Sequence, residues 1–214
     1  TSQPERSRLN RFSSSTGEET ASSTLGNRKD TKKGMDIEAT AIEGVVILRP
    51  HLYHDHRGLF YESFNAQSWA ALGFRNTFVQ DNVAESDYGV IRGLHYQIAP
   101  SPQAKLVGAL QGRILDVAVD LRRESPTFGQ FVAVWLDDKE HAMLYIPHGF
   151  AHGYAVHSEH AVVQYKCDDF WDPLTEHGIA YNDPTLAIPW GIPEEKVIVS
   201  EKDKRHPLFH RATY

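Results

Sequence analysis

The chain has 214 residues, of which 41% are hydrophobic, so it is long enough to bury the core of one sizeable domain. The formal net charge of −6 argues against a nucleic-acid-binding protein, because contacts to phosphates need a basic surface. The single cysteine, Cys167, excludes an intrachain disulfide, and no apolar run reaches the roughly 18 residues of a membrane helix. We therefore expect a cytoplasmic protein that binds neither nucleic acid nor a membrane.

Residues 1–34 differ in composition from the rest of the chain. They are rich in Ser, Thr and charged residues and poor in large apolar side chains, so they cannot bury enough surface to offset the entropy cost of ordering. We expect a flexible tail, or an extension ahead of a natural start at Met35, followed by one domain over residues 35–214.

Eight short segments rich in Val, Ile, Leu and aromatic residues follow, and we predict that they are β-strands. They are GVVILRPH (44–51), TFVQDNVA (77–84), KLVGALQG (105–112), RILDVAVDLR (113–122), QFVAVWL (130–136), AMLYIP (142–147), GYAVHS (153–158) and AVVQYKC (161–167). Turn-forming segments such as PSPQ and RRESPTFG separate them. Short helices are expected only around AQSWAALG and near the C-terminus.

The fourth of these segments alternates cleanly between apolar and mixed positions. Leu115 and Val117 share one face, whereas Asp116 and Ala118 share the other. Many short strands at regular spacing with few helices predict an all-β fold, a double-stranded β-helix of the jelly-roll or cupin-like barrel type.

Titratable residues recur in otherwise apolar strands: His95 in RGLHYQ, and Lys105, Asp116 and Tyr165 in the segments above. Taken singly, each is expected to face water, because antiparallel sheets often have one wet face. Together they occur in strand after strand, and burying them on the inner face of a small barrel is costly without a ligand. The pattern therefore indicates a polar-lined cavity that holds a ligand.

A series of motifs occurs in order between about residues 44 and 208. They are DHRGLFYESF, FVQDN, GVIRGLHYQ, QAKLV, GRILDVAVDLRRESPTFGQ, IPHGFAHGY, EHAVVQYKCDDFWDP, NDP and SEKD. In this order they resemble the dTDP-4-dehydrorhamnose 3,5-epimerase family. The specific part is RGLHYQ with a Lys ten residues after its His, followed by DLRxxSPTFG and GFAHGY, whereas PxGxxH is common among cupins.

This resemblance implies a fold, an assembly and an activity. The family has a jelly-roll fold, works as a homodimer that shares strands across its interface, and needs no metal or organic cofactor. It implies an isomerase that inverts C3 and/or C5 of dTDP-4-dehydro-6-deoxy-D-glucose by proton transfer. The product would be dTDP-4-dehydro-L-rhamnose or a mono-epimerised relative for deoxysugar biosynthesis.

A 4-ketone makes the C–H bonds at C3 and C5 acidic, because the carbanion delocalises into the carbonyl, and inversion then needs a base and an acid on opposite faces of the ring. His95 is the candidate base, because its ordinary pKa of about 6.5 suits proton abstraction near neutral pH. By the resemblance, Asp203 orients His95 and Tyr165 donates the proton. Lys105 would stabilise the enolate oxygen. The structural alternatives are a solvated Asp203, a core Tyr165 and an exposed Lys105.

Polar and aromatic residues elsewhere are candidates for binding the diphosphate, the sugar and the base. Arg offers a planar fork for phosphate oxygens, and neighbours in alternate positions of one strand point the same way. The candidates are Arg57, Glu62, Gln80, Asn82, Arg92 and His152, with Glu176 and Lys202 added by family position and Asp116 near the sugar or near His152.

Three positions depart from the family pattern. Trp171 stands where the family has a Tyr that stacks on thymine, and an indole stacks at least as well. His148 replaces an acid, and Tyr154 adds a hydroxyl close to the site that bears on which carbon is inverted. An epimerase of C3 alone or of C5 alone therefore stays open.

Two other classes of function compete with the epimerase. In a metal-dependent cupin, an oxygenase or sugar isomerase, His54, His56, Glu62 and His152 would form a site of three His and one carboxylate. Against it, the HxH lies in a turn rather than a strand. A non-catalytic barrel that binds a nucleotide sugar would need phosphate contacts but neither an acid nor a base. Within the same chemistry, a ketoisomerase is a further alternative.

Overall fold

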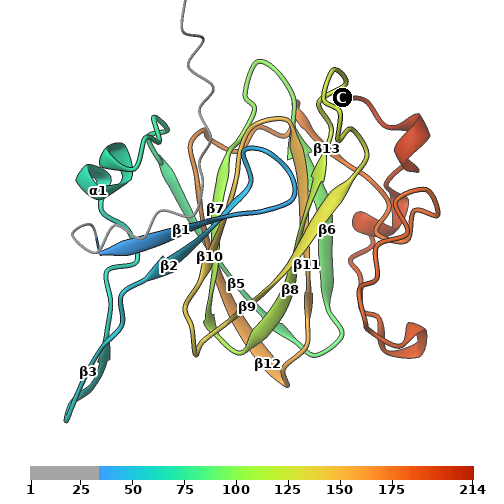
Figure 1. Ribbon diagram of the computed structural model, residues 1–214. Helices are drawn as coiled ribbons and strands as arrows, with labels where there is room; N and C mark the ends of the chain where they lie inside the picture. The colour runs from blue at the N-terminus through green and yellow to red at the C-terminus, as the bar shows by residue number, and fades with distance from the viewer. Residues whose placement is uncertain (1–33) are drawn as a thin grey trace, which may run out of the picture.

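The structure, a computed structural model, describes residues 34–214, so the predicted tail lies outside the described residues up to position 33. Two antiparallel sheets pack face to face and form the predicted jelly roll (Figure 1). The six-stranded sheet runs in the order β1 (Met35–Ala39), β2 (Val46–Pro50), β10 (Met143–Ile146), β7 (Lys105–Gln111), β12 (His160–Cys167) and β5 (Gln80–Asp87). The five-stranded sheet runs β13 (Glu176–Gly178), β6 (Ile91–Gln97), β11 (Phe150–Val156), β8 (Arg113–Asp120) and β9 (Phe131–Asp137).

Strand β8 of the five-stranded sheet is buried on both faces. The inner face of β8 carries Ile114 and Ala118 into the core between the sheets, as the alternation of this segment predicts. Its outer face carries Leu115 and Val117 into a second apolar cluster. A strand buried on both sides therefore still uses one face for the barrel interior.

The C-terminal segment, residues 179–214, supplies the other half of that second cluster. It runs along the outer face of the five-stranded sheet, next to β6 and β13 (Figure 1). Ile179, Trp190 and Phe209 are its buried apolar anchors. The Asp183 carboxylate ties its ends together, because it accepts hydrogen bonds from the backbone N–H groups of Leu186 and Phe209, each at 2.8 Å. This path brings the last residues of the chain back to β6.

Only short helices occur within residues 34–214. They are α1 (Ala66–Ala71) and three 3-10 turns, η1 (Glu194–Lys196), η2 (Asp203–Arg205) and η3 (Phe209–Arg211). The Asn65 side chain caps α1 by accepting from two backbone N–H groups, and Trp69 stacks on Phe74 and packs against Tyr145 on the outer face of the six-stranded sheet. None of the helices in this part of the chain is long and apolar enough to cross a membrane.

A two-stranded ribbon projects from the body of the molecule. It consists of β3 (Tyr53–Asp55) and β4 (Gly58–Phe60) and extends away from the barrel (Figure 1). Its six strand residues are exposed, including Tyr53 at 59% and Phe60 at 68%. A lone hairpin with exposed aromatic side chains is marginally stable in water, and within residues 34–214 no third strand pairs with this ribbon.

Candidate active site

A cavity of about 480 Å³ lies between the two sheets. Both sheets and the C-terminal segment line it with residues singled out in the sequence: Arg92, His95 and His152 from the five-stranded sheet, Lys105 and Tyr165 from the six-stranded sheet, and Lys202 and Asp203 from the C-terminal segment. Its size suits a small-molecule site. The polar residues that recur along the strands therefore converge on one hollow.

A second hollow of about 250 Å³ adjoins the first and shares three lining residues with it, His95, Lys105 and Tyr165. It holds four more of the expected residues: Gln80, Asn82, Trp171 and Glu176. Gln80 donates to Asn82 at 3.0 Å and accepts from the backbone N–H of Trp171 at 3.0 Å. The two hollows together form an elongated site with a polar, aromatic end.

His95 is held by a carboxylate from the C-terminal segment. Its Nε2 lies 2.8 Å from Oδ1 of Asp203, which is almost fully buried. The other oxygen of Asp203 accepts the backbone N–H of Gly93 at 3.1 Å. Gly93 has a φ of +124°, and a Cβ there would lie 2.6 Å from the Cα of Gly153, so only glycine fits between β6 and β11. The RGLH segment thus holds His95 and the Asp203 carboxylate together.

The charge state of this pair follows from its surroundings. Burial by itself raises the pKa of Asp203, but the imidazoles of His206 and His95 outweigh it and hold the pKa well below its ordinary value. An ionised carboxylate only accepts, so Nε2 of His95 must carry the proton of this hydrogen bond. Nδ1 is then the free base nitrogen of the neutral ring. Burial also lowers the pKa of His95, which keeps the ring neutral near pH 7.

The opposite wall carries Tyr165 on β12 and Lys105 on β7, two adjacent strands of the six-stranded sheet. The Lys105 ammonium lies 5.9 Å from the centre of the Tyr165 ring. Burial raises the pKa of Tyr165 and lowers that of Lys105, because both charged forms lose hydration there. Within residues 34–214 neither side-chain end has a hydrogen-bond partner.

His152 forms a buried support behind the cavity. Its Nε2 lies 2.7 Å from Oδ1 of Asp116, and its ring centre is 6.5 Å from that of Tyr165. The sequence expectation of Asp116 near His152 matches this contact. Tyr154, also on β11, has a buried hydroxyl with no hydrogen-bond partner among the described residues, and burial raises its pKa to about 12.

Two cationic side chains border the cavity. Arg92 donates to the Ser86 hydroxyl at 3.1 Å and to the backbone carbonyl of Glu85 at 3.3 Å. Lys202 forms an ion pair with Glu176, which joins the C-terminal segment to β13. These residues supply positive charge at the rim, as anionic phosphates require.

Two of the expected binding residues lie elsewhere. Arg57 is on the projecting ribbon, where it pairs with Asp55, and Glu62 accepts from Asn65 at the start of α1. Neither lines the hollows that contain His95. The reason is local: the segment DHRG forms the tight turn of the ribbon, which carries Arg57 away from its own barrel.

The metal site considered from the sequence is also dispersed. His54 and His56 are exposed on the ribbon, whereas His152 is buried inside the barrel against Asp116. Among residues 34–214, one group of three possible ligands does have its donor atoms within 4.8 Å of one another: His95, Asp203 and His206.

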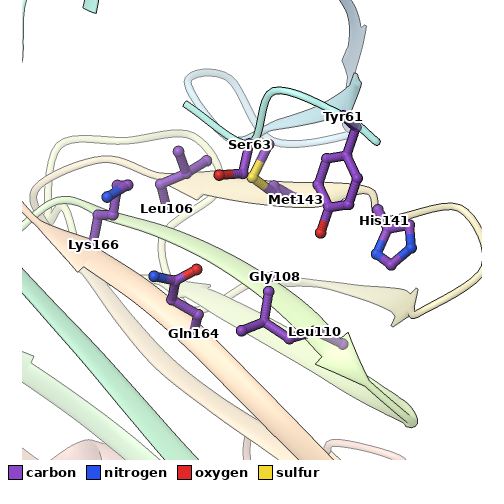
Figure 2. A pocket seen from close by; sticks show the side chains of 10 residues that line it. Tyr61, Ser63, Leu106, Gly108, Leu110, His141, Met143, Gln164 and Lys166 are labelled. Atoms are coloured by element: carbon purple, nitrogen blue, oxygen red, sulfur yellow. The ribbon is translucent and has the colours of Figure 1, made fainter. Parts of the chain in front are cut away.

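A separate hollow lies on the outer face of the six-stranded sheet (Figure 2). Figure 2 shows the Tyr61 hydroxyl and the Met143 side chain above it, with Gln164 from β12 and Leu110 from β7 below. None of the residues singled out in the sequence lines it. It belongs to the outer surface, on the other side of the sheet from Tyr165.

Sequence reasoning missed one residue next to His95 and Asp203. His206 lies three positions after Asp203, and its Nε2 is 3.4 Å from the same carboxylate oxygen that His95 contacts. The available signal was the spacing, because side chains at i and i+3 of a 3-10 turn lie above one another. That signal requires knowing that a 3-10 turn forms here.

Comparisons with known proteins show which family the chain resembles. A sequence model described as dTDP-4-dehydrorhamnose 3,5-epimerase matches residues 39–211. The Pseudomonas aeruginosa protein of that name is 47% identical over 176 residues, covering 82% of this chain and 96% of the relative. The crystal structure of that enzyme from Elizabethkingia anophelis has a TM-score of 0.80 at 44% identity, covering 85% of this chain and all of the other. A dTDP-6-deoxy-D-glucose-3,5-epimerase from Legionella pneumophila, in complex with dTDP-4-keto-L-rhamnose, has a TM-score of 0.79 at 47% identity, covering 83% of this chain and 94% of the other.

Proposed function

Because the chain belongs to the dTDP-4-dehydrorhamnose 3,5-epimerase family, we propose that it inverts C3 and C5 of dTDP-4-dehydro-6-deoxy-D-glucose, with His95 as the base and Tyr165 as the acid. The observation that carries this assignment is that the two side chains line one cavity from opposite sheets. A sugar ring between them would present one face to an imidazole and the other to a phenol.

His95 and Tyr165 together account for both proton transfers of one inversion. His95 Nδ1 takes the proton from C3 or C5, and the electrons of that C–H bond move into the carbonyl to give an enolate. Tyr165 then donates its phenol proton to the same carbon from the opposite face. The protein is left with a protonated imidazole and a phenolate, and exchange with water restores both.

Lys105 is proposed to stabilise the oxygen that becomes negative. Its ammonium lies on the Tyr165 side of the cavity and has no hydrogen-bond partner among the described residues. A cation aimed at developing charge in a site with little water lowers the energy of the enolate more than that of the ketone. Lys105 therefore contributes to the rate rather than only to binding.

The nucleotide is assigned to the adjoining hollow. Trp171 offers a face for the base, since it is more than half exposed, and Gln80 and Asn82 offer amide groups beside it. Arg92 and Lys202 are the cations assigned to the diphosphate, and Glu176 stays paired with Lys202. His152, held by Asp116, is assigned to the sugar.

The protein is proposed to act as a homodimer in which each ribbon completes the partner's site. The support is twofold: Arg57 lies outside the cavity of its own chain, and the aromatic side chains on its ribbon are exposed. A second copy would cover those side chains and add a guanidinium to the diphosphate end. Glu62, at the base of the ribbon, would lie near that interface.

Incubation with the dTDP-linked 4-keto sugar in heavy water tests the activity. NMR is expected to show deuterium at both C3 and C5 of the product. Label at one carbon only would identify a mono-epimerase of this family, and no label at either carbon would refute the proposal.

Mixing two inactive variants tests the shared site. His95→Ala and Arg57→Ala homodimers are mixed and allowed to exchange subunits. If the ribbon serves the partner, each mixed dimer contains one intact site, so activity is expected to rise above the sum of the separate variants. If Arg57 serves its own chain, no intact site forms and mixing has no effect.

A further inference from the structure

His206 sits directly behind the catalytic pair and has no part in the proton transfers described above. It follows η2, and the 3-10 turn places its ring back over Asp203. Its Nε2 is 3.4 Å from the Oδ1 atom that lies 2.8 Å from Nε2 of His95. The two imidazoles meet edge to face, with ring centres 5.5 Å apart. One carboxylate oxygen is therefore shared between two rings.

The fold makes room for this second ring at a specific position. Gly178 on β13 pairs with His95 across the sheet, and a Cβ on Gly178 would lie 2.4 Å from the ring of His206. The His206 side chain is only 12% exposed, and its Nε2 makes no hydrogen bond within residues 34–214. This buried ring nitrogen lies 3.4 Å from the Asp203 carboxylate, which is the distance of an ion pair but not the geometry of a hydrogen bond.

We propose that His206 is a positioning residue of this site, which holds the Asp203 carboxylate from a second side and sets the acidity range over which His95 remains a free base. This inference rests on the proposed function, because it assigns a task to a group behind the proposed base. It concerns regulation of that base by pH and does not change the reaction.

The physical reason is competition for one negative charge. A protonated His206 would draw on the Asp203 carboxylate and repel a protonated His95 across a short distance. His95 would then lose its proton more easily and stay a free base at lower pH. The effects on His95 run in this direction: burial lowers its pKa most, Asp203 raises it, and Lys105 and His206 lower it further.

Other charged or titratable groups also face the pair, and they remain unchanged in the test. They are Lys105 from β7, Tyr165 from β12, Glu176 from β13, Arg92 from β6, His152 and Tyr154 from β11, and Lys202 from the C-terminal segment. A change in pH dependence caused by substituting His206 alone therefore reports on His206.

The test compares two variants with the full-length wild-type protein over pH 5.5 to 9, with deuterium incorporation as the assay. His206→Phe keeps a ring but removes the donor and the charge, so the acid limb of kcat/KM is expected to move to higher pH. The ratio of kcat/KM at pH 6 to that at pH 8 should fall about threefold, which equals about 0.7 kcal/mol. His206→Gln keeps a neutral donor and is expected to shift less.

A residue with a merely structural role would give a different result. It would lower activity equally at all pH values, or lower only the thermal midpoint, and either result would overturn the proposal. Should His206→Phe fail to fold, His206→Gln and an NMR titration of the His95 ring protons in the wild type and that variant carry the test. An unchanged His95 titration in folded His206→Gln would then count against it.

Two further experiments, the Gly178→Ala variant and a chelation control, separate a positioning role of His206 from metal binding at the same three residues. Gly178→Ala is expected to displace the His206 ring and reproduce the acid-limb shift, and an unchanged limb would contradict the geometry. All assays are repeated with EDTA, because three donors meet at this point. If chelation abolishes wild-type activity, a metal ion holds the three groups and the positioning role is wrong. Failure of the proposed function is recognised separately, since the wild type would then show no deuterium incorporation.

Discussion

The two walls of the cavity are organised differently. On the five-stranded sheet, His95 is fixed by Asp203, which is held in turn by Gly93 and contacted by His206. On the six-stranded sheet, Tyr165 and Lys105 have no hydrogen-bond partner within the described part of the chain. The wall proposed to remove a proton is thus complete in the free protein, whereas the wall proposed to bind the enolate and return the proton keeps polar groups unpaired. Unpaired polar groups at a cavity surface are a cost that a ligand removes.

The largest loss of activity is expected from a substitution of His95, on the five-stranded sheet. His95→Ala removes the proposed base, so deuterium incorporation should fall by about 10⁴-fold. The affinity for dTDP, measured by calorimetry, should change little, because the nucleotide is assigned to the adjoining hollow. His95→Gln, which keeps a hydrogen-bonding side chain beside Asp203, serves as the matched control. Exchange that persists in His95→Ala would show that another group is the base.

Tyr165→Phe tests whether the second wall acts later than the first. Without the phenol, formation of the epimerised product should fall by about 10³-fold. His95 can still remove a proton and return deuterium from the same face, so label should enter substrate that keeps its configuration. NMR distinguishes label in substrate from label in product. Equal loss of both signals would mean that Tyr165 is needed before proton removal.

A smaller effect is expected when Lys105 is replaced by Met, which keeps an unbranched side chain that is one atom shorter but removes its charge. The enolate loses one stabilising cation, so kcat should fall by about 10²-fold while KM changes much less. Lys105→Arg is the control, and a partial return of kcat is expected because the charge is restored. A change confined to KM would assign Lys105 to binding instead.

Asp168 connects the ends of β12 and β7, the two strands that carry Tyr165 and Lys105. Weakening this connection is expected to have the smallest effect of the changes considered. Asp168, just after β12, accepts the backbone N–H of Ala104, just before β7, at 2.6 Å, and it pairs with His148 at 2.8 Å. The hydrogen bond with Asp168 raises the pKa of His148 above its ordinary value. The pair therefore stabilises the fold fully below about pH 6.5, and the contribution is lost as pH rises through the raised value.

His148→Asn is thus expected to lower the free energy of unfolding by less than about 1 kcal/mol, because His148 is 47% exposed. Urea denaturation at pH 5.5 and pH 8.5 measures it. The difference between the variant and the wild type should be present at the lower pH and vanish at the higher one. A difference that grows with pH would contradict the assigned pairing.

Sequence reasoning recovered the barrel because its strands are short, apolar and separated by turns. It also identified residues that meet in the cavity, since His95, Lys105 and Tyr165 interrupt otherwise apolar strands. It did not place Arg57 relative to the cavity, because the exposed residues of a short hairpin leave no periodic pattern of buried positions. It missed His206, because a histidine in the charged run EKDKRH looks solvated until a 3-10 turn places it over Asp203.

The position of Asp203 in the chain has a consequence for truncation. Every strand of both sheets precedes it, and it reaches β6 only because the C-terminal segment folds back over the five-stranded sheet. A chain that stops before Asp203 would contain all the strands, but it would lose the carboxylate proposed to orient His95 and the Phe209 side chain of the outer apolar cluster. A short C-terminal deletion is therefore expected to remove both activity and part of the core.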